Sequence, residues 1–316
     1  MRPVSRLTSF QKLALWTTGV TYFLILVGGL VRASGAGLGC PDWPRCFGSW
    51  IPPASADQLP AGFDPAQFNA TLMWTEYLNR LLGVIVGLLI FATLVSAWRH
   101  HRRSPRIMWT TLAAFLLVGF QGWLGGVVVE HELAPWIVTV HLIVALIIVS
   151  LLLYATVYAF FVSAPPNPRD VRGTLAWSTL ILMIVTLGQV ALGAQVRGRI
   201  DEALTDGTPR SNALATVGAF DLWHRDVAII VLGLTLVVVL IVFNRHGRER
   251  ALVRIAMAMS ALVLVQILVG VSMAYGSLTP AGQVAHLTAS SLILGAETVL
   301  LLLARWLPFR SVIGDR

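Results

Sequence analysis

The chain has 316 residues, of which 56% are hydrophobic and only 12% are charged. A soluble globular domain carries about 25% charged residues, so this composition excludes an ordinary soluble protein. The net charge of +8 comes without a basic cluster interleaved with aromatic residues, and no nucleic-acid partner is expected. Apolar runs of about 20 residues, long enough to cross a hydrocarbon core, recur along the chain and predict an all-α integral membrane protein.

Eight transmembrane helices are predicted. If the N-terminus lies in the cytoplasm, 16 of the 23 Lys and Arg residues fall in cytoplasmic segments. Positive charge concentrates on the cytoplasmic side of membrane proteins, so both termini are predicted to be cytoplasmic, and membrane lipid surrounds the chain. The predicted spans are residues 13–33, 72–97, 108–129, 135–162, 174–196, 216–243, 254–276 and 282–304.

The longest predicted loop, residues 34–71, follows the first span on the outer side and contains Cys40 and Cys46. A short amphipathic helix is expected near residues 65–70. Because an outer loop faces an oxidising compartment, a disulfide between the two cysteines is expected. Two roles are open for it: a structural staple, and a redox-active or substrate-transferring pair. A metal site is not expected, because two cysteines without a nearby histidine are too few ligands.

An internal repeat relates the two halves of the chain. Six pairs of positions recur with a constant offset of 145 over some 67 residues. Each half begins and ends on the same side, so the two copies run parallel. The chain is therefore predicted to form two pseudo-symmetric four-helix bundles, residues 1–165 and 166–316. The recurring pairs are Glu76 and Asp221, Arg80 and Arg225, Gln121 and Gln266, Gly125 and Gly270, Pro135 and Pro280, and His141 and His286.

Two histidines are predicted to face each other in the second bundle. His224 lies near the outer end of the sixth span, and His286 lies near the outer end of the eighth. Ionisable residues inside membrane spans are rare and usually functional, and helical bundles hold hemes between facing helices. Two imidazoles would give a six-coordinate heme that transfers electrons. A proton-relay pair and structural hydrogen bonding are the alternatives, whereas zinc would need more ligands.

The matching pair in the first bundle is Asn79 and His141. Because an amide is a poor iron ligand, a heme here would be held by His141 alone, with one face open for oxygen chemistry. Glu76 lies on the same helix face as Asn79 and could relay protons or stabilise positive charge at a reacting carbon. A salt bridge between Glu76 and Arg80, four residues later, is the alternative. Arg80 and Arg225 could instead bind heme propionates.

The loop motif GLGCPDWPRC at residues 37–46, the duplicated eight-span architecture and the register of the histidines resemble the heme A synthase family of bacteria and mitochondria. That family oxidises a methyl group of heme O to a formyl group, which gives heme A for the cytochrome oxidases. The resemblance implies a multi-pass protein of the bacterial plasma membrane, with heme O as substrate and heme b as cofactor. Heme O synthase, cytochrome oxidase assembly factors and a second copy of the chain are the partners that it suggests.

The resemblance also assigns roles to particular residues. The histidine pair that holds heme b in the family maps onto His224 and His286. The substrate-heme site maps onto His141, Glu76 and the cysteine pair, and the remaining family histidine falls on Asn79. An active synthase is favoured. The alternatives are a di-heme electron-transfer cytochrome and an inactive heme-handling assembly factor.

Overall fold

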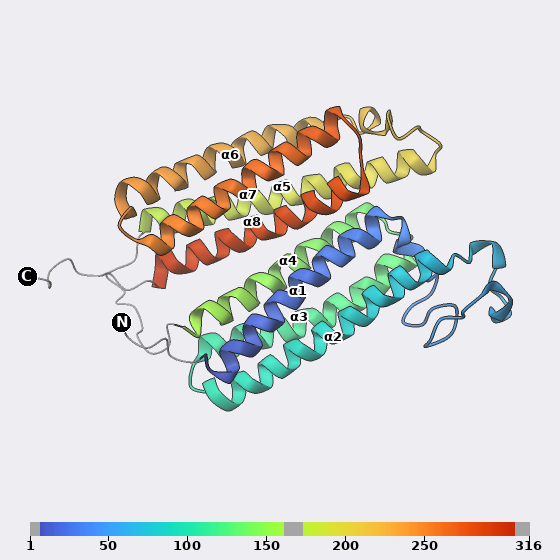
Figure 1. Cartoon of the computed structure of the whole chain (residues 1–316), viewed down its shortest axis with the longest axis horizontal. Helices are drawn as coiled ribbons and strands as arrows, with labels where there is room; N and C mark the ends of the chain where they lie inside the picture. The colour runs from blue at the N-terminus through green and yellow to red at the C-terminus, as the bar shows by residue number, and fades with distance from the viewer. Residues whose placement is uncertain (1–6, 161–172, 307–316) are drawn as a thin grey trace, which may run out of the picture.

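Within residues 7–160 and 173–306, which the computed structural model describes, the chain forms eight long helices (Figure 1). Each is long and apolar enough to cross a membrane, so the predicted all-α architecture with eight spans is confirmed. The predicted boundary between residues 165 and 166 lies outside the described residues. The helices are α1 (Ser9–Ala33), α2 (Ala70–His101), α3 (Pro105–Glu130), α4 (Pro135–Tyr158), α5 (Gly173–Thr205), α6 (Ala219–His246), α7 (Arg250–Tyr275) and α8 (Pro280–Trp306).

Local sequence signals fix where several helices begin. Pro105, Pro135 and Pro280 are the first residues of α3, α4 and α8. Proline suits this position, because a helix start leaves its backbone N–H unpaired and needs the φ that proline already has. Thr8 caps α1 within a capping box, and Asn69 caps α2 by accepting a backbone N–H. These starts therefore depend on neighbouring residues and not on tertiary packing.

The helices pack as two groups, α1–α4 and α5–α8, which Figure 1 shows in blue to green and in yellow to red. In each group consecutive helices pack side by side and the first packs against the fourth. Thus α2 stands diagonally across from α4, and α6 from α8. The groups meet where α8 packs against α1 and α4, and where α4 packs against α5. Leu146, Val190 and Leu294 form a buried apolar cluster there, and α8 is the most deeply buried of the eight helices.

Residues 34–69 connect α1 to α2 and form the cysteine loop. Figure 1 shows this loop at one end of the helices, here called the loop end, whereas α1 begins and α8 ends at the opposite end. The short helix expected near residues 65–70 is only the 3₁₀ turn η3 (Pro65–Gln67), because Asn69 already caps α2. The loop contains two further 3₁₀ turns, η1 (Ala36–Leu38) and η2 (Ala56–Gln58).

Helix α5 continues to Thr205, beyond its predicted end at residue 196. Charged residues end the apolar run there, but the helix continues because Arg197 pairs with Asp201 one turn later, at 2.7 Å. Ile200, on this extension, packs into an apolar cluster with residues of the 3₁₀ turn η5 (Ala213–Thr216). The apolar run therefore marked the part of α5 suited to the membrane interior, and not the whole helix.

Candidate functional site

The cysteine loop is closed by a disulfide between Cys40 and Cys46, whose Cα atoms lie 4.8 Å apart, as predicted. Both cysteines are completely buried. The turn between them is stabilised by the Asp42 carboxylate, which accepts the backbone N–H groups of Phe47 at 2.6 Å and Gly48 at 2.9 Å. The loop is thus a small ordered unit at the loop end of α2.

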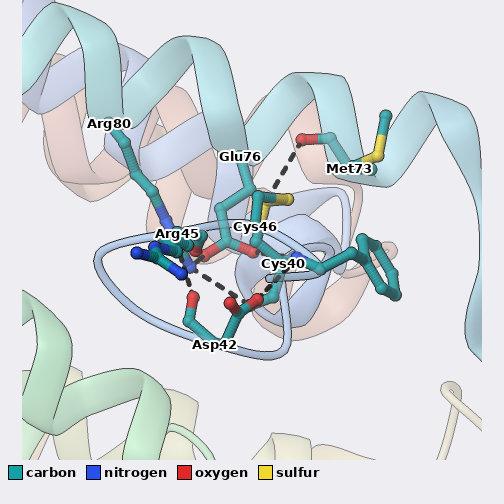
Figure 2. A network of polar contacts seen from close by, with 8 residues as sticks. Cys40, Asp42, Arg45, Cys46, Met73, Glu76 and Arg80 are labelled. Atoms are coloured by element: carbon teal, nitrogen blue, oxygen red, sulfur yellow. Dashed lines mark hydrogen bonds and ion pairs between the residues drawn. A yellow bond between two sulfur atoms is a disulfide. The ribbon is translucent and has the colours of Figure 1, made fainter. Parts of the chain in front are cut away.

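Glu76 of α2 lies directly beneath this loop and is only 4% exposed. Its Oε2 atom accepts the backbone N–H of Cys40 at 2.8 Å. Its Oε1 atom accepts a hydrogen bond from Arg80 Nε at 3.1 Å and a second one from Arg80 Nη2. Figure 2 shows both side chains directed at the cysteine loop. The salt bridge that the four-residue spacing suggested is therefore present.

Arg80 also holds the cysteine loop in place. Its Nη1 atom donates to the carbonyl oxygens of Asp42 at 2.7 Å and Arg45 at 2.8 Å, and its Nη2 atom donates to that of Cys40 at 3.1 Å. Gly39 lies so close to α2 that a side chain there would overlap the helix backbone. All three guanidinium nitrogens of Arg80 thus donate to partners within the protein. The contact between Arg80 and a heme propionate stays a prediction.

The repeated ion pair in α6 has different surroundings. Arg225 donates to Asp221 through Nε at 3.0 Å and to the Tyr275 hydroxyl through Nη1 at 3.3 Å. Its side chain is 40% exposed, whereas that of Arg80 is 15% exposed beneath the cysteine loop. The same sequence pattern thus forms an enclosed pair in α2 and an open pair in α6. A propionate contact of Arg225 also stays a prediction.

His224 and His286 are brought together between the diagonal helices α6 and α8. Their ring centroids lie 6.3 Å apart and the ring planes are inclined by 60°. His224 lies against Gly193 of α5, where an added Cβ would come within 2.9 Å of the ring. His286 lies against Gly270 of α7, with a corresponding distance of 3.2 Å. Both Nδ1 atoms are buried and have no hydrogen-bond partner among the described residues.

Asn79 and His141 occupy the equivalent places in the first group, on the diagonal helices α2 and α4. His141 lies against Gly125 of α3, where an added Cβ would be 3.5 Å from the ring. Asn79 lies near Gly28 of α1, where the corresponding distance is 4.0 Å. The His141 Nδ1 and Asn79 Oδ1 atoms are buried without a partner in the described part of the chain. At each of the four positions a buried polar side chain therefore lies beside a glycine of a neighbouring helix.

Each of these three histidines is accompanied by a glutamine. The glutamine lies one helical turn before the glycine that the histidine ring contacts. Gln121 and Gln189 donate their side-chain N–H groups to the backbone carbonyls of His141 and His224, each at 2.8 Å. Gln266 has the same four-residue spacing to the glycine beside His286 in α7. These glutamines therefore help to position the backbone from which the histidines project.

The site of Asn79 lacks this glutamine, because Leu24 stands one turn before Gly28. The Gln-x-x-x-Gly spacing is visible in the sequence and could have been noticed there. Its meaning is not visible, because only the packing reveals that these glycines face the histidines. The heme site proposed for the first group thus differs from that of the second at Leu24 as well as at Asn79.

Glu297 is a further candidate that sequence reasoning missed. It is the one acidic residue of α8 and is fully buried. The Thr186 hydroxyl of α5 donates to its Oε1 atom at 2.7 Å, while its Oε2 atom has no partner within residues 7–160 and 173–306. The sequence could have indicated Glu297, because it is a single acidic residue inside an apolar span. Burying an ionisable side chain in a membrane costs free energy, and such residues are often functional.

Replacing Thr186 with valine is expected to destabilise the protein by about 1–3 kcal/mol, because it leaves the buried Glu297 carboxyl without its hydroxyl donor. Thr235→Val is the matched control. Thr235 is also buried, but its hydroxyl donates only to the Val231 carbonyl of its own helix. Thermal unfolding in detergent should show a clear loss of Tm for Thr186→Val and little change for the control. Equal losses would contradict the prediction.

The histidine sites fit a heme better than a bare metal ion. No group of three or more His, Cys, Asp or Glu side chains that could hold a metal ion occurs in the described ranges. A heme needs only one or two protein ligands, because the porphyrin supplies the others. His224 and His286, whose rings face each other at a centroid separation of 6.3 Å, match that requirement.

Comparisons with known proteins agree with this arrangement. The family model described as cytochrome oxidase assembly protein matches residues 11–298. A heme A synthase of Beijerinckia indica subsp. indica is 28% identical over 302 residues, which cover 81% of this chain and 82% of that protein. A heme A synthase of Rhizorhabdus wittichii is 24% identical over 329 residues, which cover 93% of each chain. The predicted resemblance is confirmed: the chain belongs to the cytochrome oxidase assembly protein family, as a multi-pass protein of the bacterial cell membrane.

Proposed function

We propose that this chain is a heme A synthase, which oxidises a methyl group of heme O to a formyl group for cytochrome oxidase assembly. The observation that carries the proposal is its similarity to heme A synthases, which covers 93% of the chain in one relative. One site has two histidines, and the other has a single histidine with a buried acid on the diagonal helix, which suits a division between electron transfer and chemistry.

In the α5–α8 group, His224 and His286 would hold a heme b. Held by these two imidazoles, the heme would supply electron transfer. The facing rings on diagonal helices support this assignment. So do Gly193 and Gly270, which leave space where a side chain would press on each ring.

In the α1–α4 group, His141 would bind the substrate heme O. Asn79 would leave the opposite face without a protein ligand, which oxygen chemistry requires. Glu76 lies three residues before Asn79 and so on the same face of α2, nearer to the loop end. The polar side chains of this site are thus a single imidazole, an amide and an enclosed carboxylate.

A gem-diol formed by two oxidations of the methyl group loses water to give the formyl group. We assign to the Glu76 carboxylate the transfer of a proton from one hydroxyl of the diol to the other, which leaves as water. Arg80 and the Cys40 N–H group hold both of its oxygens. Oε2 accepts the Cys40 N–H group and keeps a lone pair that can take a proton.

We also propose the arrangement of the protein in the membrane. Residues 1–165 would form the substrate unit and residues 166–316 the heme b unit. Both termini would be cytoplasmic and the loop end would face outward. The packing of α1–α4 and α5–α8 as separate groups supports this division. Heme O synthase would deliver the substrate, and cytochrome oxidase assembly factors would receive the product.

The decisive experiment expresses this chain together with a heme O synthase in a bacterium that lacks its own heme A synthase. Mass analysis of the extracted hemes should detect heme A or hydroxylated heme O. A purified protein with low-spin heme but no modified heme would instead be an electron-transfer cytochrome. Reversible binding of heme without turnover would instead identify an assembly factor.

Gly193→Ala is expected to weaken the C-terminal heme site, because its Cβ would come within 2.9 Å of the His224 ring. The ring must then move from its present place. Gly188→Ala in the same helix is the matched control, since nothing lies within 4 Å of its added Cβ. Absorption spectra of the purified variants should show reduced low-spin heme only for Gly193→Ala. Normal heme content in both would contradict the prediction.

A further inference from the structure

Two arginines from different helix groups share one aspartate near the loop end. Asp201 of α5 accepts a hydrogen bond from Arg32 of α1 through Oδ2 at 3.0 Å. Its Oδ1 atom lies 2.7 Å from Arg197 Nη2, one turn earlier in α5. Two guanidinium groups and one carboxylate leave this cluster with a net charge of +1. The cluster is separate from the Glu76–Arg80 pair and from the histidines.

The cluster has hydrogen-bond donors to spare. The Nε and Nη1 atoms of Arg32 and the Nη1 atom of Arg197 are buried, and none has a partner in the part of the chain that the structure describes. Burying an unpaired charged donor costs several kcal/mol, so such groups normally have partners. A guanidinium presents its N–H groups as a planar fork that matches a carboxylate. The cluster therefore has the charge and the donors for one further carboxylate.

The position of the cluster indicates which carboxylate it would bind. Arg197 lies four residues after Gly193, which contacts His224, and so on the same face of α5. Arg32 lies four residues after Gly28, which is beside Asn79, but its hydrogen bond to Asp201 holds its guanidinium next to that of Arg197. Both arginines are therefore one turn, about 5.4 Å, nearer to the loop end than the glycines beside the proposed heme sites.

We propose that Arg32 and Arg197 bind a propionate carboxylate of the heme held by His224 and His286, with Asp201 orienting both guanidinium groups. This inference rests on the proposed function, and it assigns the propionate to residues other than Arg80 and Arg225. Because Arg32 belongs to α1 and Arg197 to α5, the propionate joins the two helix groups. An anionic lipid headgroup could also bind two arginines at the end of a helix. The test therefore distinguishes a heme propionate from a lipid headgroup.

The test compares heme b with its dimethyl ester, in which both propionates are uncharged. Heme-free protein in nanodiscs of zwitterionic phosphatidylcholine is titrated with each, and the low-spin absorption band reports Kd. The unmodified protein should bind heme b at least about tenfold more tightly than the ester, because hydrogen bonds to a charged group are lost. Arg32→Gln and Arg197→Gln should bind both forms with similar Kd and keep the low-spin band. Arg199→Gln is the control, since that guanidinium stacks on Phe220 at 4.4 Å.

Each outcome is decisive. Equal binding of heme b and its ester by the unmodified protein would overturn the inference, and so would a tenfold preference that survives in both variants. A cluster that binds lipid headgroups and not the propionate would show no preference in phosphatidylcholine, with or without added phosphatidylglycerol, and that outcome overturns the inference as well. If the unmodified protein forms no low-spin heme at all, the proposed histidine ligands are wrong, and the inference fails with them. A normal low-spin band without the preference overturns the inference alone.

Discussion

Replacing His286 with alanine is expected to abolish the low-spin heme spectrum of the purified protein. His286 and His224 face each other at a centroid separation of 6.3 Å, and loss of one imidazole leaves the iron with a single strong ligand. Absorption and electron paramagnetic resonance spectra should both lose the low-spin signal. His131→Ala is the control, because His131 is exposed in the turn between α3 and α4.

An unchanged low-spin spectrum in His286→Ala would contradict the ligand assignment and favour a proton-relay or structural role for the pair. His141→Ala provides a second comparison. It should leave the low-spin signal intact but abolish heme A formation, because His141 belongs to the other group. Loss of the low-spin signal in this variant would show that the two sites have been assigned to the wrong hemes.

Replacing Glu76 with glutamine is expected to reduce heme A formation by about 10²–10⁴-fold, the usual contribution of a positioned acid or base. Glutamine has nearly the same size but cannot accept a proton as a carboxylate does. Heme A per protein chain, measured by mass analysis after co-expression with heme O synthase, reports the loss. Glu130→Gln, an exposed acid at the end of α3, is the control and should retain normal heme A formation.

The Glu76→Gln protein should still fold. Arg80 keeps its bonds to the carbonyls of Cys40, Asp42 and Arg45, so the cysteine loop retains its anchor to α2. The low-spin heme of the other group is therefore expected to be unchanged, which separates a chemical effect from unfolding. Normal heme A formation would leave the bonds to Arg80 and to the Cys40 N–H group as the whole role of Glu76.

Much of the fold could be predicted because membrane spans are long apolar runs. All eight predicted spans overlap a helix, and the cysteines form the expected disulfide. The end of α5 could not be predicted in this way. Arg197 and Asp201 interrupt the apolar run, but their ion pair and the packing of Ile200 continue the helix. Hydropathy reports which residues suit the membrane interior, whereas helix ends also depend on such contacts.

The candidate site was only partly predictable, for a physical reason. The repeat aligned His224 with Asn79 and His286 with His141, and helical spacing suggested the Glu76–Arg80 pair. The other partners of that pair are backbone atoms of the cysteine loop, and no residue pattern reveals a bond to a carbonyl or an N–H group. The partner of Glu297, the Thr186 hydroxyl of a different helix, was hidden for a similar reason.

The difference between Leu24 and the glutamines at the other three sites bears on protein engineering. Asn79→His alone would restore a fourth imidazole, but its backbone carbonyl would lack the amide donor that Gln189 provides for His224. Leu24→Gln would have to accompany it to give the first group the same pair of residues. A designer who wants a di-heme electron carrier from this scaffold must therefore change two helices together. Reversing both substitutions, Leu24→Gln and Asn79→His, would again leave the first site with a single histidine.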